Sequence, residues 1–311
     1  MNKCFIGGNV LSIIDDIKRL KKEKNAVILA HYYVCDEVQE IADFVGDSYY
    51  LSKKATEVPE SMIVFAGVNF MGESAKILNP EKNVVMVDAN ADCPMAHMIT
   101  PEKIQEIRNK YDDIAVCCYI NSTAQIKAHS DVCVTSSNAL DIVKSLPNKN
   151  IFFIPDGNLG RYISKEVTDK NFIFNDGYCP VHVKITKDDI LAKKLEYPNA
   201  KVLIHPECTP DAVELADYAG STSGIIDYAT KSDCKEFIIA TEKGVLYELK
   251  TKNPNKSFYT VNDNQICPDM KFVTLEKIKN VIENTENVVE LSDELMIGAK
   301  NALEEMLRLA K

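Results

Sequence analysis

Three cysteine–proline pairs recur along this chain of 311 residues and could together supply three thiolates to one site. They are Cys93-Pro94, Cys179-Pro180 and Cys267-Pro268. Three protein thiolates suit an iron–sulfur cube with one iron left open, or a zinc ion with one open position. The alternative is that Cys-Pro only builds a turn around a buried thiol. Their near-regular spacing of 86 and 88 residues favours a shared role as metal ligands.

A polar pair stands 60 to 62 residues before each of these cysteines and directly follows an apolar run. The pairs are His31 and Tyr33, Tyr119 and Asn121, and His205 and Glu207. Residues two apart on an extended segment point to the same side, so both members of a pair can face one ligand. A single histidine after a strand is more often structural. Two histidines at equivalent positions favour a function.

A hydroxyl residue follows the first member of each pair after 17 residues, at Ser48, Ser136 and Thr222, and each begins a helical pattern. One interpretation is simple N-capping of those helices. The other is an anion site, because three helix N-termini that point to a common axis would favour negative charge. The substrate is then expected to carry carboxylates or a phosphate.

The same period places an aspartate five residues before each hydroxyl and a threonine seven residues after each cysteine. These are Asp43, Asp131 and Asp217, and Thr100, Thr186 and Thr274. A fixed period indicates copies of one supersecondary unit. Three copies favour closure about a pseudo-threefold axis, so the three cysteines are expected to face one another there.

In each repeat, the pattern of apolar residues predicts three strands that alternate with helices, and the Cys-Pro pair follows the third strand. The strands are expected at 27–30, 62–65 and 84–87, at 114–118, 151–154 and 172–174, and at 201–204, 237–240 and 258–261. Continuous apolar strands that alternate with helices indicate parallel sheets covered on both faces. The predicted fold class is α/β, with three pseudo-threefold-related αβα sandwich domains, parallel sheets and an active site at the central axis.

The domains are expected at 1–99, 100–185 and 186–283, with a tail at 284–311 that packs back on the first. The tail includes a predicted helix at 292–309. Further helices are predicted after the three threonines, at 101–111, 187–195 and 275–282.

Composition limits the functional classes. The net charge is −10, and the absence of a basic run argues against nucleic acid as a partner. No apolar run approaches the roughly 18 residues that would span a membrane, and we expect a cytoplasmic protein. Its ten cysteines then favour metal binding or catalysis by a subset over disulfides.

The seven cysteines outside the repeat positions are expected to have other roles. Cys117, Cys118 and Cys133 are predicted to be core residues, and Cys208, next to Glu207, could approach the site. No role is assigned to Cys4, Cys35 and Cys234. His97, His129 and His182 have no equivalents in the repeat, so we expect them at the surface or in support of the site.

Taken jointly, these motifs resemble those of the quinolinate synthases of the A type, the iron–sulfur enzymes of de novo NAD biosynthesis. The resemblance runs over nearly the whole chain. The motifs that carry it are His31-x-Tyr33, Ala42-Asp43-Phe-Val-Gly46-Asp47-Ser48, Cys93-Pro-Met-Ala96, Tyr119-Ile-Asn121-Ser122-Thr123, Gly177-Tyr-Cys179-Pro-Val-His182, His205-Pro-Glu207-Cys208 and Gly220-Ser-Thr222.

The resemblance implies a transferase that condenses iminoaspartate with dihydroxyacetone phosphate to quinolinate, phosphate and water. It implies a 4Fe–4S cluster on Cys93, Cys179 and Cys267, with the open iron acting as a Lewis acid. It also implies proton transfer by Tyr33 and functional coupling to an enzyme that oxidises L-aspartate. His205 and Glu207 can move protons by their chemistry, and Tyr119 is the fourth expected catalytic residue. The substrate-binding residues that it implies are His31, Ser48, Tyr119, Asn121, Ser136, His205, Glu207 and Thr222.

Two positions depart from the family pattern. Some members carry Cys-x-x-Cys-x-x-Cys near the C-terminus, where this chain has Cys267-Pro-Asp-Met270 with one cysteine. Many members also have asparagine where this chain has a tyrosine in His31-Tyr32-Tyr33.

Three other classes fit parts of the pattern. One is another iron–sulfur hydro-lyase that acts on a small hydroxy acid, a second is a non-catalytic iron–sulfur sensor or carrier, and a third is a structural zinc protein. Carriers normally use four protein ligands, and in a carrier the polar residues at the strand ends would have no task.

Overall fold

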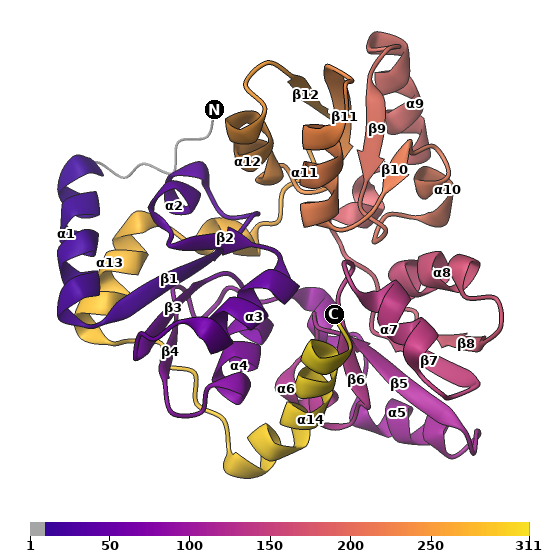
Figure 1. Ribbon diagram of the computed structural model, residues 1–311, viewed down its shortest axis with the longest axis horizontal. Helices are drawn as coiled ribbons and strands as arrows, with labels where there is room; N and C mark the ends of the chain where they lie inside the picture. The colour runs from indigo at the N-terminus through magenta and orange to yellow at the C-terminus, as the bar shows by residue number, and fades with distance from the viewer. Residues whose placement is uncertain (1–9, 311) are drawn as a thin grey trace. The chain divides into compact units, whose positions relative to one another are not determined.

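The computed structural model of the chain describes residues 10–310, which form two compact units. The first unit contains the chain up to Cys93 together with Cys267–Met296. The second contains Pro94–Ile266 together with the residues from Ile297 onward. The sheet of the first repeat belongs to the first unit, and the sheets of the other two repeats belong to the second (Figure 1).

Within the described residues, each repeat forms one parallel sheet of four strands, and the strand order across the sheet is the same in all three. The second strand of a repeat lies at one edge, followed by the first, third and fourth. The strands are β1 (Ala26–His31), β2 (Phe44–Gly46), β3 (Met62–Ala66) and β4 (Asn83–Met86), then β5 (Ile114–Tyr119), β6 (Val132–Val134), β7 (Asn150–Ile154) and β8 (Asn171–Phe174), then β9 (Lys201–Ile204), β10 (Tyr218–Ala219), β11 (Glu236–Ala240) and β12 (Ser257–Thr260).

Helices connect the strands, as parallel pairing requires, so the predicted fold of three αβα sandwich domains is confirmed. They are α1 (Val10–Glu23), α2 (Asp36–Ile41), α3 (Ser48–Glu57), α4 (Asn69–Leu78), α5 (Pro101–Arg108), α6 (Ala124–Ala128), α7 (Ala139–Ser145), α8 (Gly157–Glu166), α9 (Lys187–Glu196), α10 (Pro210–Val213), α11 (Thr222–Lys231), α12 (Val245–Lys252), α13 (Leu275–Asn284) and α14 (Asp293–Leu309). A short 3₁₀ turn follows each Cys-Pro pair, at Pro94–His97, His182–Lys184 and Asp269–Phe272.

The prediction of three strands per repeat is wrong by one. The additional strands β2, β6 and β10 have only two or three residues, and each pairs with a single neighbour. Segments this short are not revealed by the apolar periodicity on which the prediction depends.

The repeated aspartates hold these edge strands in place. The carboxylates of Asp43, Asp131 and Asp217 accept hydrogen bonds from backbone N–H groups 15 residues earlier on the first strand, at distances of 2.7 to 2.8 Å. The backbone N–H of each aspartate donates in return to the carbonyl of the same strand residue. Each aspartate therefore extends the hydrogen-bonded pairing of the edge strand with the first strand by one position.

A repeated lysine closes the helix that follows each edge strand. Lys82, Lys170 and Lys256 each stand directly before the fourth strand and donate to the carbonyl oxygens of Val58, Leu146 and Ser232, respectively. These three carbonyls belong to the C-caps of α3, α7 and α11. A cation at a helix C-terminus satisfies carbonyls that have no partner within the helix and opposes the negative end of its dipole.

The threonines after Cys-Pro cap the helices as predicted. The side chains of Thr100, Thr186 and Thr274 accept hydrogen bonds from backbone N–H groups three residues later. Each turn of the chain from a cysteine into the next helix is thus fixed locally.

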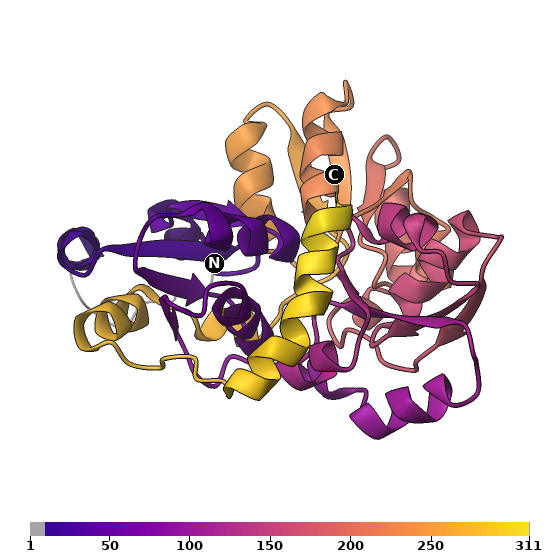
Figure 2. The ribbon, with the colours of Figure 1, turned by 60° about the horizontal axis from the view of Figure 1, so that its bottom comes forward.

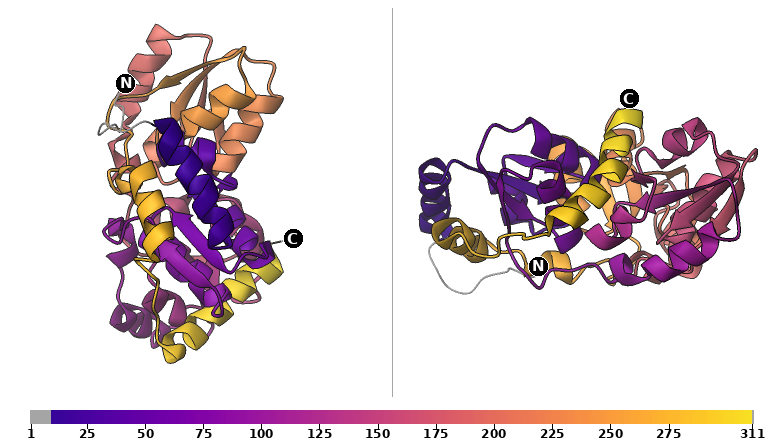
Figure 3. Two further views of the ribbon diagram at one scale, coloured as in Figure 1. Left: turned by 90° about the vertical axis from the view of Figure 1, so that its left-hand side faces the viewer. Right: turned by 90° about the horizontal axis from the view of Figure 1, so that it is seen from below.

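Segments from the two ends of the sequence meet within the first unit. Helices α1 and α13 pack side by side (Figure 3). Asn287 and Val289 exchange backbone hydrogen bonds with β4. Further along the tail, α14 passes α6 within the second unit (Figure 2). There Gly298 lies against Ala128. Between residues 10 and 310 there is no helix with the length and apolar character needed to cross a bilayer.

Candidate active site

The predicted polar pairs stand at the carboxyl ends of the first strands of the three sheets, where open α/β sheets bind ligands. His31 and Tyr119 are the last residues of β1 and β5, and His205 follows β9 directly. These three side chains and Glu207 are buried.

In the second unit, a network of short hydrogen bonds centres on Glu207. The Tyr119 hydroxyl donates to Oε1 of Glu207 at 2.5 Å, and the other carboxylate oxygen lies 2.7 Å from Nδ1 of His182. The same Nδ1 lies 3.1 Å from Sγ of Cys179. The structure therefore brings together strand-end residues of the second and third repeats and one of the three repeated cysteines.

The His182 ring is held on its other side by Thr241, whose Oγ1 lies 2.9 Å from Nε2. Thr241 directly follows β11. His182 was expected at the surface or in support of the site. The surface alternative is wrong, because the imidazole is buried, and its contacts with Cys179 and Glu207 agree with a supporting place. The spacing Cys179-x-x-His182 is a signal in the sequence that could have identified it.

His205 has a defined hydrogen-bond pattern. The backbone N–H of Glu207 donates to its Nδ1 at 3.3 Å, so the ring proton of the neutral imidazole stands on Nε2, which lies 3.1 Å from Oγ of Ser136. The first unit repeats this local geometry, because the N–H of Tyr33 donates to Nδ1 of His31 at 3.2 Å. The spacing of two in the polar pairs therefore has a structural basis as well as a chemical one.

Burial and charge set the protonation of these groups. Burial lowers the pKa of His205 to about 4, against an opposing attraction to Glu207, so the ring is neutral at neutral pH. Burial by itself would raise the pKa of the Glu207 carboxyl, but the attraction of His182 and His205 and the hydrogen bonds from His182 and Tyr119 outweigh it. The resulting pKa is below the usual value, and Glu207 is ionised.

A second carboxyl was missed because it follows the third strand of its repeat. Asp156 stands two residues after β7 and accepts a hydrogen bond from the N–H of Leu159 at 2.8 Å. Its Oδ2 is buried without a hydrogen-bond partner among the described residues. Burial and then the nearby charge of Glu207 raise the pKa of Asp156 well above the usual value, which favours the protonated form of a side chain beside the network.

The capping interpretation of the three hydroxyls is wrong. The caps of α3 and α11 are Asp47 and Ser221, which accept from the backbone N–H groups of Tyr50 and Gly224. Ser48 and Thr222 are the first residues of those helices. Ser136 precedes the cap of α7, which is Asn138. The side chain of Ser136 instead contacts His205.

Asn121 lies in the loop that follows β5, and its Oδ1 is buried without a hydrogen-bond partner among the described residues. The side chain of Asn158, on α8, donates to the backbone carbonyl of Glu207 at 3.2 Å. The side-chain amide of Asn121 thus lies in the loop after β5, and that of Asn158 lies against the backbone of Glu207.

In the first unit, the loops of two repeated cysteines lie against each other. The Asp269 carboxyl accepts a hydrogen bond from the backbone of Asp92, the residue before Cys93. Lys271, in the same turn as Asp269, donates to the carbonyl of Tyr33. The turn after Cys267 therefore contacts both the loop of Cys93 and the end of β1. Cys93 and Cys267 belong to this unit, and Cys179 belongs to the other.

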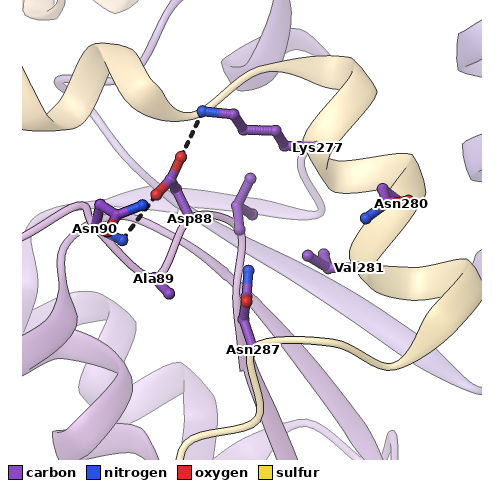
Figure 4. Close-up of a pocket in the computed structure, with 8 residues that line it drawn as sticks. Asp88, Ala89, Asn90, Lys277, Asn280, Val281 and Asn287 are labelled. Carbon is purple, nitrogen blue, oxygen red and sulfur yellow. Dashed lines mark hydrogen bonds and ion pairs between the residues drawn. The ribbon is translucent and has the colours of Figure 1, made fainter.

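A cavity of about 200 Å³ in the first unit contains none of the predicted site residues. Asp88 lies at its edge, where it accepts from the N–H of Asn90 and pairs with Lys277 of α13 (Figure 4). This ion pair ties α13 to the loop that leads to Cys93.

The remaining cysteines are mostly core residues. Cys117, Cys118 and Cys133 are buried on β5 and β6, as predicted. Cys208 is also buried, in the apolar core of the third repeat, with its Sγ 3.7 Å from the carbonyl oxygen of Ala240. Cys35 and Cys234 are partly exposed, and Cys4 lies outside the described residues.

The chain is similar to known proteins over nearly its whole length. The family model described as NadA, quinolinate synthetase A protein, matches residues 15–308. Quinolinate synthase from Fusobacterium nucleatum is 57% identical over 95% of this chain and 99% of its own length. The enzyme of that name from Clostridioides difficile is 54% identical over 95% of this chain and 97% of its own length, and that from Caldicellulosiruptor bescii is 52% identical over 97% and 99%.

Proposed function

The chain belongs to the quinolinate synthetase A family, so it is an enzyme of quinolinate synthesis, and we propose that it condenses iminoaspartate with dihydroxyacetone phosphate. The products are quinolinate, phosphate and water. The observation that carries the assignment of the site is the Glu207 network, in which Tyr119, His182 and Cys179 meet one buried carboxylate.

The three repeated cysteines are the proposed ligands of a 4Fe–4S cluster. They fit this group by their chemistry: Cys93, Cys179 and Cys267 are thiols outside any disulfide, partly exposed at equivalent loop positions, whereas Cys117, Cys118, Cys133 and Cys208 are buried in the cores. Soft thiolates favour iron–sulfur clusters. When bound, the cluster supplies an iron without a cysteine ligand, which acts as a Lewis acid for the loss of hydroxide.

Glu207 is the proposed general base. Its carboxylate is ionised and buried, and the hydroxyl of Tyr119 donates to Oε1. A proton taken from the carbon next to a substrate carbonyl can be held on this carboxylate. His182 and Tyr119 fix both of its oxygens, so little reorganisation is needed when the proton moves.

Neutral His205 is proposed to bind the substrate and to donate a proton from Nε2. That nitrogen lies beside Ser136, at the carboxyl end of the sheets. Ser136, Thr222, Asn121, Ser48 and His31 are the other proposed contacts of the substrate's carboxylates and phosphate. Tyr33 is proposed to transfer a proton.

The wider setting follows from the substrate. Iminoaspartate hydrolyses in water, so we propose that the protein works in the cytoplasm with an enzyme that oxidises L-aspartate and supplies this substrate. The proposal concerns functional coupling of two reactions and requires no stable complex between the enzymes.

An anaerobic assay tests the function. Iminoaspartate is generated in place from L-aspartate, dihydroxyacetone phosphate is added, and quinolinate and phosphate are measured over time. We expect both products in equal amounts, and none when either substrate is omitted. Dehydration of a small hydroxy acid, with no quinolinate, would contradict the assignment and favour a hydro-lyase.

A further inference from the structure

We propose that Cys179, His182 and Glu207 form a binding site for a single divalent cation of the zinc type when the chain carries no cluster. This site differs from the three-cysteine set, because it takes one sulfur, one nitrogen and one oxygen ligand from a single compact unit. It goes beyond the proposed function and does not depend on it.

The three donor atoms already lie close together. Sγ of Cys179, Nδ1 of His182 and a carboxylate oxygen of Glu207 are all within 4.8 Å of one another. Nδ1 lies 3.1 Å from the sulfur and 2.7 Å from Oε2 of Glu207. Ligands of tetrahedral zinc lie about 2.0–2.3 Å from the ion, so their donor atoms lie roughly 3.3–3.7 Å from one another. Nδ1 of His182 and Oε2 of Glu207 would therefore move apart by roughly 0.6–1 Å when the ion binds. Small side-chain rotations would complete the site.

The second nitrogen and the second oxygen of the ligands have their own partners. Nε2 of His182 lies 2.9 Å from Oγ1 of Thr241, which fixes the ring and leaves Nδ1 directed at the other two ligands. Oε1 of Glu207 accepts from Tyr119 and leaves Oε2 for the ion. Supporting groups of this kind orient the ligands of protein metal sites and raise their affinity.

The local sequence also suits a metal ion. Two residues separate Cys179 from His182, which begins the 3₁₀ turn His182–Lys184. The backbone N–H of Val183 donates to the carbonyl of Cys179. Glu207 arrives from the end of β9. His182 and Glu207 are buried and Cys179 is partly exposed. The site therefore has one accessible side and offers a fourth position to water.

One consequence is competition between metals. Cys179 is also a proposed ligand of the cluster. Its thiolate cannot bind the zinc ion and an iron of the cluster at the same time. Zinc bound by Cys179, His182 and Glu207 would therefore slow the assembly of a cluster on the same chain.

Cobalt(II) is the probe, because a thiolate ligand gives it an intense near-ultraviolet absorption band. Cluster-free protein is prepared by anaerobic chelation and titrated with cobalt(II). We expect one tightly bound ion per chain with this band. X-ray absorption of the zinc form is expected to show one sulfur neighbour, with nitrogen or oxygen in the other positions.

Matched variants separate this site from the three-cysteine set. Cys93→Ser and Cys267→Ser are expected to bind cobalt as the wild type does, whereas Cys179→Ser loses the absorption band. Thr241→Val leaves all three ligands in place and is expected to weaken binding by about 10–100-fold. Circular dichroism checks that each variant is folded.

Three results would overturn the proposal. They are the failure of the wild type to bind one equivalent, loss of the band in Cys93→Ser or Cys267→Ser, and unchanged affinity in a folded His182→Ala variant. Because Cys93→Ser also lacks a proposed cluster ligand, cobalt binding by this variant is independent of quinolinate formation. Failure of the cation site and failure of the proposed function are thus distinguishable.

Discussion

The hydroxyl of Tyr119 donates a 2.5 Å hydrogen bond to Glu207, a residue 88 positions away in the next repeat. Tyr119 ends β5, and Glu207 stands three residues after the end of β9. The bond joins the carboxyl ends of two sheets and fixes one oxygen of a buried carboxylate. The other oxygen is fixed by His182.

Removal of the proposed base should lower the turnover rate more than it weakens substrate binding. In Glu207→Gln the side chain keeps its size but loses the carboxylate, and we expect kcat to fall by about 10²–10⁴-fold with a smaller change in KM. Steady-state rates of quinolinate formation measure this. Iron content must match the wild type for the rates to be compared.

Tyr119→Phe is the companion variant, because it removes the donor to Oε1 and leaves the carboxylate. A smaller fall in kcat than in Glu207→Gln is expected. Wild-type kcat in both variants, at full iron content, would show that Tyr119 and Glu207 bind the substrate or support the fold and do not transfer protons.

The neutral state of His205 predicts a pH dependence of stability. Its pKa is about 4 in the folded chain, below the usual value of 6.5, so the unfolded chain binds more protons between these values. Stability should therefore fall as the pH is lowered from 7 to 5, by about 2 kcal/mol from this group. Urea unfolding at several pH values measures the change.

His205→Gln is the control, because glutamine does not titrate in this range. The difference in stability between wild type and variant should shrink or change sign toward pH 5. The low pKa of Glu207 contributes only below its usual value of 4.5, outside the range used. Parallel pH profiles for the two proteins would contradict a buried neutral imidazole.

The repeated aspartates should matter for stability and not for chemistry. Asp217→Ala removes the acceptor of the Val202 N–H, which is part-buried, and such a loss costs about 1–3 kcal/mol. Asp217→Asn keeps an oxygen at the same place and should be milder. Thermal unfolding compares the two variants, and equal midpoints would argue against a role for this bond.

Most of the fold was predictable from the sequence because apolar runs and the repeat both mark the strands. The edge strands β2, β6 and β10 were missed because they are too short to show a period. Lys82, Lys170 and Lys256 stand at equivalent positions, and the repeat could have revealed them. Their role depends on hydrogen bonds from the lysine side chains to carbonyl oxygens at a helix C-terminus. Spacing in the sequence does not show which helix end lies near each lysine.

The site was predictable where its residues recur in the repeat and not elsewhere. Tyr119, Ser136, His205 and Glu207 contact one another as a connected set. His182 and Thr241 have no polar equivalent in the other repeats. Asp156 has one, Glu242, which also stands two residues after the third strand of its repeat, but both lie outside the polar pairs that follow the first strands. Their importance arises from burial beside Glu207, which is a property of the packed chain.

The most direct test of the account is the iron content of single cysteine variants purified without oxygen. We predict that Cys93→Ser, Cys179→Ser and Cys267→Ser each lose the cluster, while Cys234→Ser, with a partly exposed thiol outside the repeat positions, keeps the iron content of the wild type. Full iron content in Cys179→Ser would contradict the proposal that three equivalent cysteines hold the cluster.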